Sequence, residues 1–371
     1  MKRYKLLSIL CIGVFTISML SCENQDVEFP DYGTSSVYFA YQYPVRTIVF
    51  GEDIYDNTLD NEGKCEIYAT MGGVYANKKK IDIDFEVDNT LCNHLFFDAD
   101  FTLPVQPMPS NYYTLSANQI SLNHDLQGSV GVQLTDDFFA DPNALLNTYV
   151  IPLRMVNVVN ADSILSGVPK VEEPIRSNAS HWDVQPKDYI LYCVKFINKW
   201  HANYLVRGRD EITKDGVSST RTRHQQGVEL DEVRQLTSLS LNEIRVPTDY
   251  KTQAGLNLNF GVKVILDESQ NCTVSPIGPS YAVNDSVTVY NIAVTGDGSF
   301  VDKGEKNSWG NKDRDVMYLE YDVSYEVETQ FPNTQPPLPP LLETATYHTT
   351  DTLVVRDRGI KPEVFTPAYQ E

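Results

Sequence analysis

The sequence predicts an all-β protein built from an antiparallel β-sandwich followed by an antiparallel β-barrel-like domain. From Val37 onward, short segments of alternating apolar and polar residues recur, and each is bounded by Gly, Asn, Asp or Pro. No long segment carries a helical period. The chain also contains 22 Tyr among its 371 residues, and aromatic residues favour strands.

The first 35 residues predict export and a flexible tether. Lys2, Arg3 and Lys5 precede an apolar run that ends at Leu20, which is typical of a secretory signal and too short to span a bilayer. Leu20-Ser21-Cys22 resembles the lipobox of bacterial lipoproteins, in which the Cys is acylated. This resemblance implies a signal peptide over 1–21, lipidation of Cys22 and a polar tether over 22–35 that holds the protein at the outer membrane.

Residues 36–160 are expected to form the N-terminal, immunoglobulin-like sandwich. Period-two segments recur here at the spacing of strands, and Tyr149 to Val158 is the last of them. One helical turn is expected at 141–146, where Asp141 can cap the helix and Pro142 occupies its first position.

Residues 161–187 lose the alternation and collect Pro169, Pro174 and Pro186, so we assign them to a junction. Strand patterns return at Tyr189, and 188–371 is predicted to be the C-terminal barrel-like domain, of the lipocalin or calycin kind. Residues 331–342 contain five prolines and predict a stiff excursion at a hairpin end.

Charge and cysteine content exclude several function classes. Fifty acidic residues against 30 basic ones give a net charge of −20, which repels nucleic acid. Cys65, Cys92, Cys193 and Cys272 remain after Cys22 and the signal, and none has zinc-site spacing. A Cys65–Cys92 disulfide and four buried thiols both fit the sequence, and no metal or other cofactor is expected.

Two stretches carry family resemblances. Residues 109–116, with Ile120, Gly128 and Val130-Gly131-Val132, resemble a Bacteroidota N-terminal domain of unknown function. In that family the sandwich begins lipoproteins encoded in polysaccharide-utilisation loci, and in some members it precedes a family-18 endo-β-N-acetylglucosaminidase-type module. The second half resembles an all-β partner module, through residues 195–198, Trp200-His201, Tyr204 with Arg207-Gly208, 309–315 and 351–358.

One motif needs weighing as a catalytic site. Asp82-Ile83-Asp84-Phe85-Glu86 resembles the Asp-x-Asp-x-Glu core of family-18 glycosidases, in which the Glu is the general acid. Lys79 and Lys80 stand where that family has an Asp and a small residue, and the surroundings lack the strand–helix units of a TIM barrel. We therefore interpret the motif as a half-buried strand with an acidic solvent face, and we expect no catalytic residues.

Glycan binding requires an exposed aromatic ring with polar groups beside it. Trp309 is the best candidate because Asn307 and Asn311 flank it in a loop-like segment, and Tyr112 is a further candidate. Trp182 and Trp200 are expected to be buried. Arg314, Arg356 and Arg358 stand among aspartates and predict ion-paired strand ladders.

These observations together predict a non-catalytic cell-surface lipoprotein that binds or presents glycans in a polysaccharide-utilisation system. Its expected partners are a glycan, the outer membrane through the lipid anchor, and an importer complex. Two alternatives stay open: a cell-adhesion or scaffold protein that binds a host or bacterial surface protein, and a glycoside hydrolase like some relatives of the N-terminal domain.

Overall fold

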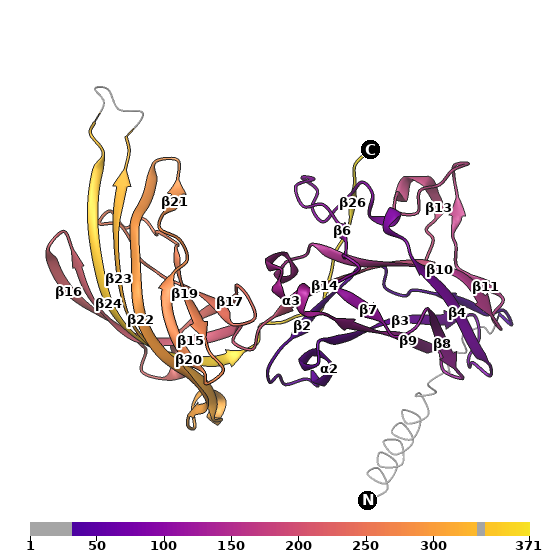
Figure 1. Ribbon diagram of the computed structural model, residues 1–371, viewed down its shortest axis with the longest axis horizontal. Coiled ribbons are helices and arrows are strands. Elements are labelled where there is room, and N and C mark those ends of the chain that lie inside the picture. Colours follow the sequence, from indigo (N-terminus) through magenta and orange to yellow (C-terminus); the bar gives the residue numbers. More distant parts are fainter. Residues whose placement is uncertain (1–31, 332–337) are drawn as a thin grey trace, which may run out of the picture.

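The computed structural model describes residues 32–331 and 338–371 and shows two β-rich domains side by side (Figure 1). Both domains are built from strands, and the helices that connect some of these strands are short. The predicted all-β class is therefore confirmed. Cys22, the signal and most of the tether lie outside the described residues, as do most of the prolines of 331–342.

The first domain is a sandwich of two sheets. One sheet has the order β11-β1-β3-β9-β7, and the other has the order β25-β2-β14-β10-β4-β8, with β6 beside β10. Most neighbours pair antiparallel, but β1–β11, β2–β14 and β6–β10 pair parallel. The strands of these sheets are β1 (Ser36–Tyr38), β2 (Pro44–Val49), β3 (Lys64–Gly72), β4 (Lys80–Val87), β6 (Gln106–Pro107), β7 (Tyr113–Leu115), β8 (Gln119–Asn123), β9 (Gln127–Leu134), β10 (Tyr149–Val159), β11 (Ser163–Ile164), β14 (Tyr189–Ile197) and β25 (Glu363–Val364).

The predicted start of the second domain at residue 188 is wrong. β14 pairs with β10 and with β2, in the middle of the second sandwich sheet. Its side chains are buried on both faces, because Tyr192 and Phe196 enter the core between the sheets while Leu191 and Cys193 enter a second cluster. An almost continuous apolar run is typical of such a central strand, and it does not reveal which sheet the strand joins.

Short helical segments connect some strands of the sandwich. η2 (Pro142–Leu145) confirms the predicted turn, and the Asp141 side chain accepts a hydrogen bond from the Asn143 N–H. The remaining short elements of the chain are α2 (Thr58–Asn61), α3 (Asp136–Ala140), η1 (Asn89–Cys92), η3 (Ala179–His181), η4 (Val228–Leu230), η5 (Trp309–Asn311) and strands β5 (Leu95–Phe96), β12 (Val168–Pro169), β13 (Trp182–Val184) and β26 (Ala368–Tyr369).

The second domain is one sheet that closes on itself, which confirms the predicted barrel. Its order is β16-β15-β17-β18-β19-β20-β22-β23-β24, and β24 returns to pair with β15. β16 and β21 extend the sheet beyond the closed part. The strands are β15 (Ala202–Lys214), β16 (Val217–Arg223), β17 (Glu232–Ser238), β18 (Glu243–Pro247), β19 (Gly261–Leu266), β20 (Asn271–Pro276), β21 (Tyr281–Asn284), β22 (Val287–Glu305), β23 (Arg314–Thr329) and β24 (Leu341–Asp357).

The barrel interior is filled by large side chains from alternate strand positions. Tyr204, Leu319, Val323 and Tyr347 belong to this core, and Trp200 joins it as predicted. Each Å² of apolar surface buried in this core contributes about 25 cal/mol, so burial of the inward side chains is the main stabilising contribution to the domain. The opposite side chains of the same strands face outward and are free to serve another purpose.

The two domains are joined by Asn198 and by the end of the chain. The Asn198 side chain is buried and donates to the carbonyls of Ser240 and Glu243. The Asn198 carbonyl accepts from Arg358, just after β24. Beyond Arg358 the chain leaves the barrel and adds β25 and β26 to the first domain, so part of 188–371 also belongs to the sandwich.

In residues 32–331 and 338–371 the four cysteines are free and buried, which confirms the free-thiol alternative. Cys65 and Cys92 lie in different apolar clusters. Trp182 is buried in the junction, as expected, and its indole donates to the Ile175 carbonyl. No helix of the described chain is both long enough and apolar enough to cross a membrane.

Asn198→Ala should destabilise the protein by about 2–4 kcal/mol, since buried carbonyls and N–H groups would lose their partners. Urea unfolding followed by circular dichroism measures this change. Asn93→Ala is the matched control, because Asn93 is exposed, and it should change stability by less than about 0.5 kcal/mol. Equal effects of the two substitutions would contradict the role given to Asn198.

Candidate functional site

The outward face of the second domain carries a polar surface that crosses five adjacent strands. The register places Thr220, Glu211, His348, Asp322 and Thr295 opposite one another on β16, β15, β24, β23 and β22. Because side chains two residues apart share a face, neighbouring rows lie above and below this one. Each row therefore draws one side chain from every strand, except the last row, which lies beyond the end of β16.

We call these rows the polar strip. Its side chains are mostly Ser, Thr, Asp, Glu, Arg and His. By row, it consists of Ser218, Thr213, Thr346, Ser324 and Ala293; Thr220, Glu211, His348, Asp322 and Thr295; Thr222, Arg209, Thr350, Glu320 and Asp297; and Arg207, Thr352, Tyr318 and Ser299.

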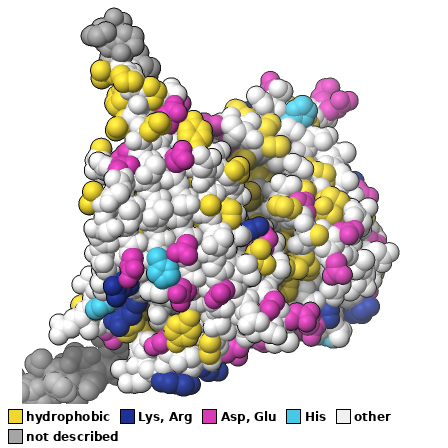
Figure 2. Space-filling view, turned by 60° about the vertical axis from the view of Figure 1, so that its left-hand side comes forward, with side chains coloured by type: hydrophobic (Ala, Val, Ile, Leu, Met, Phe, Trp, Pro, Cys, Tyr) yellow, Lys and Arg dark blue, Asp and Glu magenta, His cyan; other side chains and the backbone are white. Residues whose placement is uncertain are grey.

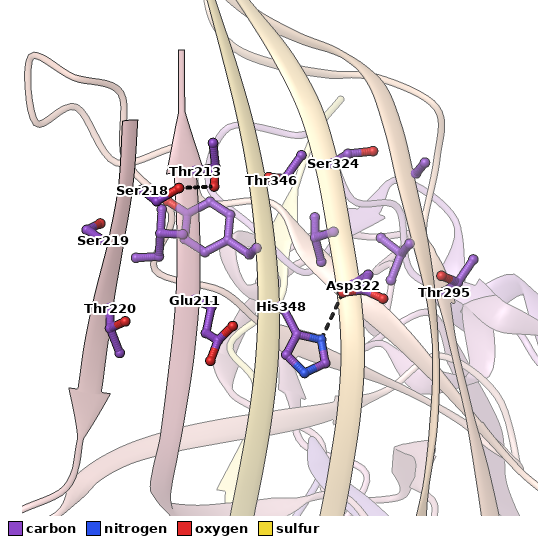
Figure 3. Close-up of a pocket in the computed structure, with 15 residues that line it drawn as sticks. Glu211, Thr213, Ser218, Ser219, Thr220, Thr295, Asp322, Ser324, Thr346 and His348 are labelled. Carbon is purple, nitrogen blue, oxygen red and sulfur yellow. Dashed lines mark hydrogen bonds and ion pairs between the residues drawn. The ribbon is translucent and has the colours of Figure 1, made fainter. Parts of the chain in front are cut away.

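Two hollows lie along the polar strip. The first has a volume of about 690 Å³ and is lined by the upper two rows (Figure 3). The second has a volume of about 500 Å³ and is lined by Arg209, Glu320, Asp297 and Tyr318 with their neighbours. Figure 2 shows the same face of the barrel, with a His side chain surrounded by acidic ones and basic side chains close by.

The polar strip ends at an apolar cluster on the same face. Leu205, Val354 and Val316 form the next row, and they are fully buried although they point out of the barrel. They are covered by Trp309 and by Val228, from η5 and η4, and Tyr318 packs against the same cluster. The strip therefore runs from an open, hydroxyl-rich end to an end closed by two aromatic rings.

Trp309 is half-buried, and two guanidinium groups lie on its ring. The Cζ of Arg314 is 4.6 Å from the ring centroid and the Cζ of Arg356 is 5.7 Å from it. Arg314 also donates to the Trp309 carbonyl. The expectation of ion-paired strand ladders is therefore wrong for Arg314, because its guanidinium makes a cation–π contact with the Trp309 indole.

The other predicted binding residues lie in two places. Asn307 and Asn311 flank Trp309 with left-handed backbone conformations (φ 46° and 55°) and are exposed. Tyr112 lies in the first domain, where its hydroxyl donates to Asp141 and its ring packs edge-on against Phe138 and Tyr149. Tyr112 therefore shares no site with Trp309.

The inner face beneath the strip is held by buried charges. Arg223 on β16 crosses over Gly208 on β15 and donates to Asp351 on β24 at 2.6 Å. A Cβ on Gly208 would lie 2.3 Å from the same carboxylate, so only Gly fits between them. Arg223 also donates to Asp210 at 2.9 and 3.0 Å, and the two carboxylates raise the pKa of its guanidinium. These contacts connect β16, β15 and β24 on the inner face of the sheet, opposite the polar strip.

His348 is the titratable group at the centre of the strip. Its Nδ1 is 2.9 Å from Asp322 Oδ1, and its Nε2 is 3.5 Å from Glu320 Oε1. The hydrogen bond to Asp322 raises the pKa of His348 above its ordinary value, with Glu320 and Glu211 adding to the effect. The open end of the strip therefore gathers three carboxylates around one imidazole.

The Asp-x-Asp-x-Glu motif lies on the solvent side of β4, as interpreted from the sequence. Asp82 accepts from Ser121, and Asp84 accepts from Gln119 and Asn157. These hydrogen bonds lower the pKa of both aspartates. Glu86 pairs with Arg154. All three acidic side chains of the motif are therefore held by neighbouring strand residues, and the motif is a hydrogen-bonded and ion-paired strand face.

The polar strip was not predicted from the sequence. Alternating Thr, Asp, Glu and His positions are visible in 318–324 and in 346–352, but each alternation taken alone indicates only a solvated strand face. The register between strands far apart in the chain brings Glu211, Asp322 and His348 together. Within the described residues no cluster of three or more His, Cys, Asp or Glu could hold a metal ion.

Comparisons with known proteins identify both domains. A family model described as a domain of unknown function, DUF5627, matches residues 199–359, and a model of an N-terminal domain matches residues 32–162. A crystal structure of a Bacteroides ovatus protein of unknown function is 39% identical, with a TM-score of 0.79 over 91% of this chain and 99% of that one. The chain belongs to the same family as this Bacteroides ovatus protein, and its residues 199–359 form a DUF5627 domain.

Other solved structures are much more distant. One is a Bacteroides ovatus protein of unknown function, 12% identical, with a TM-score of 0.40 over 90% of this chain and 99% of that one. Another is an auxiliary nutrient binding protein from Bacteroides thetaiotaomicron, 12% identical, with a TM-score of 0.35 over 84% of this chain and 90% of that one. No curated protein matches this DUF5627 protein.

We expect NMR titration of the histidine ring signals to give His348 a pKa above 6.5, because Asp322 stabilises the imidazolium. The stabilisation from the charged His348–Asp322 pair is fully present below pH 6.5, and it is lost as the pH rises through the raised pKa of His348. Asp322→Asn should lower the pKa of His348. Asp297→Asn on the same strip, which has no contact with His348, should leave it unchanged, and an unchanged value in Asp322→Asn would contradict the assignment.

Proposed function

We propose that this DUF5627 protein is a non-catalytic glycan-binding protein, tethered to the outer membrane through Cys22 and exposed at the cell surface. The observation that carries the proposal is the polar strip, an open and hydroxyl-rich surface that ends against aromatic rings. It favours glycan binding because sugars present many hydroxyls and one apolar ring face.

The side chains of the strip suit sugar hydroxyls. Ser and Thr hydroxyls both donate and accept, whereas carboxylates such as Glu211 and Asp322 accept from two directions. The two hollows, of about 690 and 500 Å³, fall within the roughly 300–1,000 Å³ of small-molecule sites. They lie end to end on one face, which suits a linear chain of sugar units.

The closed end of the strip provides the apolar contact. Tyr318 is half-buried, lines the second hollow and donates from its hydroxyl to Glu305 at 2.8 Å. Trp309 packs against the same apolar cluster as Tyr318, and its ring contacts Arg314 and Arg356. Individual sugar contacts of this kind are weak, and confinement of many copies at a membrane raises their combined effect.

Glu211→Gln with Asp322→Asn should weaken glycan binding by at least about tenfold, because each change removes a charged hydrogen-bond acceptor. Binding of the full chain to a glycan array and to mucin in affinity gels measures this. Glu172→Gln with Glu173→Gln is the matched control, since both residues are exposed and lie outside the strip. A protein that binds no glycan, or a strip variant that binds as well as wild type, would contradict the proposal.

Labelled palmitate should enter the protein in Bacteroides cells, and Cys22→Ser should abolish both labelling and membrane retention, because the acyl chains supply the anchor. Protease treatment of intact cells tests surface exposure, since a displayed chain is digested and a periplasmic one is protected. Cys65→Ser, at a buried thiol, is the control and should leave labelling intact. Labelling that persists in Cys22→Ser would overturn the anchor.

A further inference from the structure

The first domain contains a cleft that the proposed function does not use. It has a volume of about 520 Å³ and lies where the edge of β3 meets β2, β14 and the segment between β1 and β2. β1 pairs with β3 only from Thr70 onward, so residues 65–69 have a strand partner on one side only. The cleft lies along this half-paired edge.

Two exposed tyrosines converge on this cleft. Tyr68 projects from the outward face of β3 and is 52% exposed, while Tyr41 lies on the segment before β2 and is 74% exposed. A scattered exposed Tyr needs no explanation, but two from separate segments that line one hollow are unusual. Their rings provide the apolar surface on which a sugar ring stacks.

Polar groups stand beside these rings. The Glu66 carboxylate accepts from the Tyr68 hydroxyl at 2.5 Å and from the Ser129 hydroxyl at 2.9 Å, so its direction is fixed. Carboxylate oxygens have further lone pairs, and here those are free to accept from a ligand. The Gln127 side chain lines the same hollow and can donate, whereas the Thr70 hydroxyl there donates to the Leu126 carbonyl and can accept from a ligand.

The charge of the cleft indicates the ligand class. Arg46 lines the hollow but pairs with the buried Asp60, so its charge is already balanced. Glu66 is bonded by hydroxyls rather than by a cation, which leaves the cleft negative. A uronic or sialic acid would therefore be repelled, whereas a neutral sugar would use Glu66 as an acceptor for its hydroxyls.

From these observations we propose a second binding site, formed by Tyr41, Tyr68, Glu66 and Gln127 in the first domain, for a neutral pyranose unit. This site does not depend on the polar strip. It lies on the other domain, so a glycan or two neighbouring glycans bound at both sites would be held bivalently.

The test is binding of the full chain to an array of neutral and acidic oligosaccharides. Tyr41→Ala with Tyr68→Ala should lower the signal on neutral glycans by about tenfold, because both stacking surfaces are lost. Tyr32→Ala with Tyr75→Ala is the matched control, since both tyrosines are more than half exposed outside the cleft, and it should bind as wild type does. Glu66→Gln retains both rings and should also weaken binding, which separates recognition from a loss of folding.

The outcomes separate the two sites. Loss of binding in the cleft variants, with the polar-strip variant unaffected on the same glycans, supports the second site even if the strip binds nothing. Unchanged binding in both cleft variants, preference for acidic glycans, or no binding of the wild-type chain to any neutral sugar overturns it. Loss in the strip variant alone would leave the proposed function standing and refute the second site.

Discussion

The pairing of β15 with β24 is the constraint on which the second domain depends. It runs from Asn203 opposite Asp357 to Lys214 opposite Ala345, and it joins one of the first strands of the barrel to the last. Closure satisfies the backbone of strands that would otherwise be exposed edges. The same register aligns the outward side chains of β15 and β24 at the centre of the polar strip, and the ladders to β16, β23 and β22 extend these rows.

Buried charges reinforce that ladder at its centre. Asp210 and Asp351 are almost completely buried, and Arg223 reaches both because Gly208 leaves room for it. Buried ion pairs are stabilised when their remaining hydrogen bonds are satisfied. Here Thr349 and Tyr321 donate to the two carboxylates, whereas Arg223 Nη1 is buried without a partner. This arrangement specifies the register of β16, β15 and β24 beneath the proposed site, because a slip by one residue would leave these charges unpaired.

The two domains are connected by more than a linker. The chain passes from β14 to β15 through Asn198, whose side chain is held by the barrel, and it returns after β24 to add β25 to the sandwich. Phe365 is buried between Tyr43 and Phe97 on that return. The two proposed sites therefore lie on domains connected at both Asn198 and the end of the chain, which suits the proposed binding of one ligand at more than one point.

The sequence by itself determined the all-β class, the sandwich and the barrel, the turn at Asp141, the buried Trp182 and Trp200, and the structural nature of Asp82 and Asp84. Each of these follows from local alternation, capping or neighbouring residues, which can be read within a short stretch of sequence. It did not determine that Tyr189–Ile197 belongs to the first domain, that Arg314 lies on Trp309, or that His348 meets Asp322. Those facts are set by pairing between strands far apart in the chain, and only the tertiary structure decided them because alternation specifies the face of a strand and not its neighbour.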